Sequence, residues 1–120
     1  MLKGVVNRRG EPLVPILLVS RSHHRRKHPA VIDTGFNGHL SLPEKLAHRY
    51  GWRWVGHESY EIATGDLVQE KVFLGRVHWQ RHTQEVYAVA SHARDILIGT
   101  RLLQRHRLTI DFQKKTVRIT

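Results

Sequence analysis

One acidic side chain, Asp33, lies between the apolar run Ala30–Ile32 and the dipeptide Thr34-Gly35, in the segment AVIDTGFNGHLSLP. An ionised carboxylate at the end of an apolar strand needs compensation, because burying an unpartnered charge is very costly. One explanation is that Asp33 caps the turn formed by Thr34 and Gly35. The other is that this carboxylate takes part in proton transfer, for which Asp is a common side chain.

Two further segments decide between these explanations. The segment DILIGTRLLQRHRLTIDF, residues 95–112, places a short apolar run and Gly99 before a Leu-Leu pair and a closing strand. Between it and Asp33, the segment EIATGDLVQEKVFLGRVHW, residues 61–79, has the pattern of a β-hairpin. With the segment AVIDTGF, these stretches resemble the retropepsin-like aspartic proteases, in the DTGF form of their small single-domain prokaryotic branch. The resemblance spans about residues 12–119.

The resemblance implies an aspartic endopeptidase that needs two copies of the chain. Members of this clan activate a water molecule between two Asp carboxylates that share one proton, because two like charges so close together cannot both ionise. This chain has a single Asp-Thr-Gly, so the implied enzyme is a homodimer with two Asp33 residues on its axis. A buried Asp33 would then be compensated by its partner carboxylate and by loop N–H groups. No cofactor is implied.

The resemblance also assigns roles to other residues. Thr34 would hydrogen-bond to the partner's backbone, and Gly35 would offer its N–H to a carboxylate. The flap hairpin would fold over an extended peptide or protein substrate and pair with its main chain. Apolar substrate side chains would contact Leu97 and Ile32. The implied flap tip consists of Ala63, Thr64, Gly65 and Asp66.

Arg101 departs from the pattern. Relatives usually have an acidic or amide residue two positions after the glycine equivalent to Gly99, where it helps anchor the active-site loop. Arg101 and the net charge of +10 motivate an alternative function, a non-catalytic module of the same fold that binds nucleic acid or an acidic partner through a basic surface. Non-specific binding to polyanions is expected for either function.

Composition sets the class of protein. The 120 residues, of which 40% are hydrophobic and 25% charged, fit one folded domain over residues 1–120. The absence of cysteine excludes a disulfide framework and a thiolate nucleophile. The segment MLKGVVNRRGEP lacks the apolar core of a signal peptide, and no apolar run is long enough to span a membrane. We therefore expect a cytoplasmic protein that does not act at a membrane.

The apolar pattern favours an all-β, barrel-like domain with about eight short strands and two short helices, as in the retropepsin-like fold. Residues 13–20 and 30–33 are expected to form a hairpin whose polar loop includes HHRRKH. A helix over about 43–50 is expected to begin with a capping box formed by Ser41 and Glu44 and to end at Gly51. The strand-like terminal segments could close the domain internally or join two copies.

Structural roles are expected for the remaining histidines and tryptophans that could suggest ligand binding. The histidine spacing in HHRRKH fits no common zinc site, and the adjacent cations would repel a metal. Trp52, Trp54 and Trp79 are expected in a core or a dimer interface rather than stacked on bases. His106 is explained as a cation at a helix C-terminus.

Overall fold

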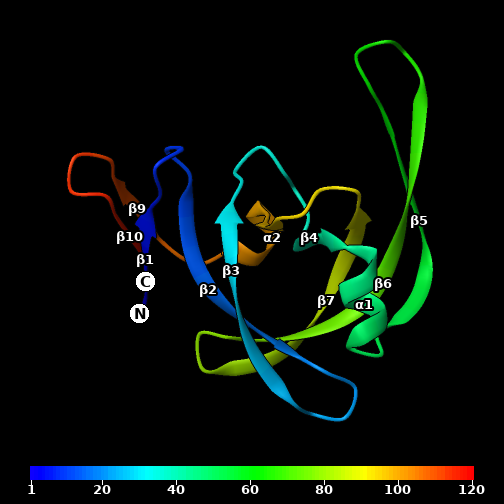
Figure 1. Cartoon of the computed structure of the whole chain (residues 1–120), viewed down its shortest axis with the longest axis horizontal. Coiled ribbons are helices and arrows are strands. Elements are labelled where there is room, and N and C mark those ends of the chain that lie inside the picture. Colours follow the sequence, from blue (N-terminus) through cyan, green and yellow to red (C-terminus); the bar gives the residue numbers. More distant parts are fainter.

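The computed structural model describes all 120 residues and contains ten strands and two short helices (Figure 1). The expectation of an all-β domain is confirmed. The strands are β1 (Leu2–Val6), β2 (Pro12–Val19), β3 (Arg25–Ile32), β4 (Leu40–Pro43), β5 (Arg53–Glu61), β6 (Leu67–Trp79), β7 (His82–Ser91), β8 (Ile96–Ile98), β9 (Leu108–Asp111) and β10 (Thr116–Ile119), and the helices are α1 (Glu44–Arg49) and α2 (Thr100–Leu103).

Six strands close into a barrel, in the order β6-β7-β4-β8-β3-β2. The ring closes because β2 also pairs with β6, with Leu17 opposite His78 and Leu18 opposite Val77. Alternate side chains of these strands point inward, since successive residues of a strand face opposite sides. They form most of a single core of 23 buried residues, in which Leu18 and Val77 are fully buried.

The terminal strands pair within the chain. β1 is antiparallel to both β10 and β2, and β10 is antiparallel to β9. Val117 and Ile119 of β10 are buried in the same core as the barrel residues. The terminal segments therefore close the domain internally.

The expected helix after residue 43 is confirmed, but its capping box is wrong. α1 begins after Pro43 without a side-chain cap, because Ser41 is a buried residue of β4 and not a turn residue. The Glu44 carboxylate instead accepts hydrogen bonds from His48 and Lys71. The helix ends at Arg49, and Gly51, whose φ of 69° favours glycine, follows its C-cap as the expected terminator. No helix of the chain is long and apolar enough to cross a membrane.

The loop between β2 and β3 is shorter than expected. Only residues 20–24 form the turn, and Arg25–His28 are already part of β3, where they pair with Ile16–Val19 of β2. The polar composition of HHRRKH conceals this strand, because the side chains of Arg25–Lys27 are exposed. The segment is thus only partly a hairpin tip.

Two of the three tryptophans lie in the core as expected, and His106 differs from expectation. Trp52 and Trp79 are core residues, whereas Trp54 on β5 is 53% exposed. The Trp79 indole N–H donates a hydrogen bond to His106 Nε2 at 3.2 Å. His106 therefore acts as the acceptor for a buried indole, and the explanation of His106 as a helix-terminal cation is wrong.

Candidate functional site

Asp33 follows the last residue of β3, at a point where three strands meet. β8 lies between β3 and β4, parallel to β3 and antiparallel to β4. The loop 33–39 leaves β3, crosses the end of β8 and returns as β4. The Asp33 backbone N–H continues the β3–β8 pairing by donating to the carbonyl of Ile98 at 3.0 Å. Strand pairing in the barrel thus fixes the backbone position from which the Asp33 side chain extends.

The Asp33 carboxylate is held by its own loop. Oδ1 accepts a hydrogen bond from the Gly35 N–H at 2.9 Å, and the Asp33 carbonyl accepts one from the Phe36 N–H at 3.1 Å. In the single chain Asp33 is half-buried rather than buried, and Thr34 and Gly35 are exposed. The expected loop N–H is therefore present, while the surface that would bury the carboxylate is not supplied by this chain.

The Phe36 ring locks the loop onto the start of α2. A Cβ on Gly38 would lie 2.6 Å from the Phe36 ring, and a Cβ on Gly99 would lie 2.7 Å from it. The ring therefore occupies the space of a side chain at Gly38, and the ring together with the Gly38 carbonyl oxygen occupies that space at Gly99, so both positions need glycine. Backbone hydrogen bonds complete the lock, from the Thr100 N–H to the Phe36 carbonyl and from the Arg101 N–H to the Gly38 carbonyl.

A cleft of about 780 Å³ opens beside this loop. Of the residues expected at the site, Asp33, Gly35 and Leu97 line it. Ile32 does not, because its side chain points into the core and is 4% exposed. We therefore expect no contact between Ile32 and a substrate. The full lining is Asp33, Gly35, Phe36, Asn37, Gly38, His39, Ser41, His57, Glu58, Tyr60, Glu70, Val72, Tyr87, Val89, Ser91, Leu97 and Arg101.

The hairpin expected as a flap is present, but its tip does not line the cleft. β5 and β6 form a long hairpin that projects beyond the barrel (Figure 1). Its turn is closed by the Gly65 N–H donating to the Ile62 carbonyl, with φ of 86° at Gly65. Residues 62–66 at this tip, which include all four expected tip residues, are exposed and lie outside the cleft lining. The arms of the hairpin, through residues such as Tyr60 and Val72, form one wall instead.

Sequence reasoning missed a cluster in the cleft lining, formed by His39, Tyr87 and Arg101. His39 Nδ1 accepts a hydrogen bond from the Tyr87 backbone N–H at 3.1 Å, and the two rings stack with centroids 6.1 Å apart. The Arg101 guanidinium lies 6.0 Å from the centre of the Tyr87 ring, within range of a cation–π contact. Arg101 thus packs against the cleft wall.

The protonation of His39 follows from this setting. Partial burial, assisted by the Arg101 charge, lowers the pKa of His39 below its ordinary value of 6.5. The ring is therefore neutral at neutral pH. Because Nδ1 is an acceptor, we assign the proton to Nε2. No sequence signal marks His39 among ten histidines; only the pairing of β4 with β7 brings it beside Tyr87.

Comparisons with known proteins bear on the fold. The sequence matches no family model and no curated protein. The structure is similar to the crystal structure of a retropepsin-like aspartic protease from Rickettsia conorii, with a TM-score of 0.66 and 18% identity over 96% of this chain and 86% of that chain. It is also similar to the solution structure of the simian foamy virus (mac) protease, with a TM-score of 0.54 and 19% identity over 74% of this chain and 90% of that chain.

These similarities, with the closed barrel and the two short helices, show that the chain has a retropepsin-like fold. At such low identity they concern the fold and leave activity to be argued from the site.

Proposed function

We propose that this protein is an aspartic endopeptidase that acts as a homodimer. The observation that carries the proposal is the position of Asp33, in a loop locked by Phe36 and opening onto a cleft of about 780 Å³, on a retropepsin-like fold. One chain supplies one carboxylate from this loop. The exposed Thr34-Gly35 segment is available to face the same segment of a second copy.

Two Asp33 carboxylates that share one proton can hydrolyse an amide. The ionised carboxylate takes a proton from water as the water oxygen attacks the carbonyl carbon, and the protonated one donates its proton to the carbonyl oxygen. The resulting tetrahedral diol collapses when the now ionised carboxylate withdraws a hydroxyl proton and the now protonated one donates its proton to the nitrogen, which leaves as the amine. The Gly35 N–H, which bonds Asp33 Oδ1, holds the carboxylate in a fixed orientation.

The cleft walls match an extended peptide. β5 is the edge strand of the sheet, so its free backbone groups can pair with a substrate strand. Leu97, Val72 and Tyr60 offer apolar contact for substrate side chains. Closure of the exposed tip, Ala63–Asp66, over a bound peptide would require the hairpin to bend towards the cleft.

The direct test is Asp33→Asn, measured by cleavage of an unfolded protein substrate and by the mass of the assembly. Asparagine is nearly isosteric but cannot exchange the proton, so we expect cleavage to fall by at least about a hundredfold while the dimer persists. The matched control is Asp95→Asn, which removes the same charge from an exposed residue outside the cleft and should cleave normally. Cleavage by Asp33→Asn at the parent rate would overturn the proposal.

A further inference from the structure

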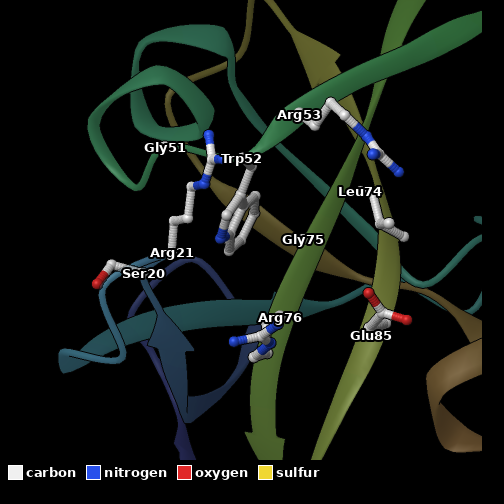
Figure 2. A pocket seen from close by; sticks show the side chains of 9 residues that line it. All are labelled: Ser20, Arg21, Gly51, Trp52, Arg53, Leu74, Gly75, Arg76 and Glu85. Carbon is white, nitrogen blue, oxygen red and sulfur yellow. The ribbon is translucent and has the colours of Figure 1, made fainter.

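A small pocket of about 220 Å³ lies away from the Asp33 cleft, where the β2–β3 turn meets β5 and β6. Figure 2 shows three arginines around the Trp52 indole: Arg21 from the turn, Arg53 from the start of β5 and Arg76 from β6. Trp52 is fixed as the floor, because its indole N–H donates to the Val19 carbonyl at 2.9 Å and its ring packs against Gly75.

A second basic pocket adjoins the first across Ser20, which lines both. Its lining includes three more arginines, Arg25, Arg26 and Arg49, together with Ser22 and His24. We call the six arginines of the two pockets the basic end; they are Arg21, Arg25, Arg26, Arg49, Arg53 and Arg76.

The arginines of the basic end have no carboxylate partners. The only ion pairs of the chain join Glu44 to His48 and to Lys71. Glu85 is the one acidic residue in either pocket, and it lies opposite Arg76 in the β6–β7 pairing. Arg76 nevertheless directs its guanidinium to His23 Nδ1, at 3.3 Å. The guanidinium groups are therefore free to bind an external anion.

The Arg25 side of the basic end is far from the candidate catalytic cleft, whereas Leu74 of the first pocket pairs with Tyr87 of the cleft. Arg25 and Asp33 stand at opposite ends of β3 (Figure 1), about 26 Å apart for eight strand residues. The positive charge of this end also acts on a nearby histidine. Partial burial lowers the pKa of His28, and the charges of Arg26 and Arg49 lower it further. A ligand there need not contact a peptide in the cleft.

We propose that the basic end binds the phosphodiester backbone of a nucleic acid. The planar guanidinium group of arginine can donate two parallel hydrogen bonds to two oxygens of one phosphate. Serine hydroxyls also commonly bind phosphate. Two adjacent cationic pockets suit a chain of successive phosphates better than one isolated anion. Trp52 is only 7% exposed, so base stacking contributes little and binding is independent of base sequence. This site is additional to the proposed peptidase function.

The test is binding of a fluorescent single-stranded 20-mer of mixed sequence, as RNA and as DNA, followed by anisotropy across a salt series. The variant Arg21→Gln, Arg49→Gln, Arg53→Gln changes three exposed arginines, at least one from each pocket. We expect affinity to fall at least about tenfold and the salt slope to become shallower by about 2, since each phosphate contact on a single strand contributes about 0.7. The nucleic acid that binds with the higher affinity, RNA or DNA, is the type that the site prefers.

The matched control is Arg8→Gln, Arg9→Gln, Lys114→Gln, which removes the same charge from exposed residues outside both pockets. It should bind almost as the parent does. Equal losses in the two triple variants would show attraction by net charge alone and overturn the site. Tighter binding of poly-glutamate than of either nucleic acid would also overturn it, by making the partner an acidic protein. Asp33→Asn should bind like the parent, so this test is independent of catalysis.

Discussion

Replacing Gly99 by alanine should destabilise the protein through the loop that carries Asp33. The added Cβ would lie 2.1 Å from the Gly38 carbonyl oxygen and 2.8 Å from that of Phe36. Neither oxygen can move freely, because the Arg101 N–H bonds the first at 3.2 Å and the Thr100 N–H bonds the second at 2.8 Å. Displacing them sacrifices two or more backbone hydrogen bonds, at about 1 kcal/mol each, with overpacking strain of about 1–3 kcal/mol. We expect a total loss of at least about 3 kcal/mol.

The assay is urea unfolding at fixed protein concentration, because association would make the midpoint depend on concentration. For a domain of this size the expected loss moves the midpoint down by about 1–3 M. Gly56→Ala is the matched control. A Cβ on Gly56 meets nothing within 4 Å and Gly56 has no positive φ, so its midpoint should stay near that of the parent.

Gly38→Ala distinguishes a steric clash with a side chain from a steric clash with the backbone. The three atoms nearest to a Cβ on Gly38 all belong to the Phe36 ring, so Gly38→Ala should be largely tolerated once Phe36 is also alanine. Gly99→Ala should stay costly in that background, because its worst contact is with a backbone oxygen. The reasoning would be refuted if Gly99→Ala unfolded at the same urea concentration as Gly56→Ala.

Three further outcomes follow from the contacts. Arg101→Gln should raise the pKa of His39 towards 6.5, as followed by NMR titration, because the Arg101 charge helps lower it; an unchanged value would contradict the placement of Arg101. Trp52→Phe should lower the free energy of unfolding by about 1–3 kcal/mol, since it leaves the Val19 carbonyl without its donor; a neutral result in urea unfolding would count against that bond. Burial lowers the pKa of both His28 and His39, so the unfolded chain binds protons more readily and stability should decline as pH falls below 6.5. Melting temperatures measured across that range, with His28→Gln showing a weaker decline, check this last outcome.

Much of the fold follows from the sequence because its local signals are strong. Apolar runs such as Val14–Val19 and Ile96–Ile98 and the turn at Gly65 predict strands and a hairpin that the structure contains. β4 was missed because its residues, Leu40–Pro43, also read as the entry to a helix. Arg25–His28 were missed as strand because exposed charged side chains hide a two-residue alternation. In both cases pairing with distant strands overrides local preference.

The candidate site divides in the same way. Asp33, Gly35 and Leu97 could be identified from the sequence because each lies in a short motif of consecutive residues, AVIDTGF for the first two and DILIG for Leu97. His39 and Tyr87 could not, since β-sheet register alone brings these two residues, 48 positions apart, into contact. The turn at residues 63–66 was predicted from Gly65, but the distance of that turn from the cleft depends on the lengths of β5 and β6. Those lengths are a property of the whole sheet.

The central claim, that two copies of Asp33 make one active site, is tested most directly by mixing. Parent chains are allowed to exchange with an equal amount of Asp33→Asn chains, and cleavage is measured per parent chain. Random pairing puts half of the parent chains into mixed dimers with one carboxylate, so activity per parent chain should fall to about half. Activity per parent chain that stays constant while subunits demonstrably exchange would show that a single Asp33 suffices and would contradict the account.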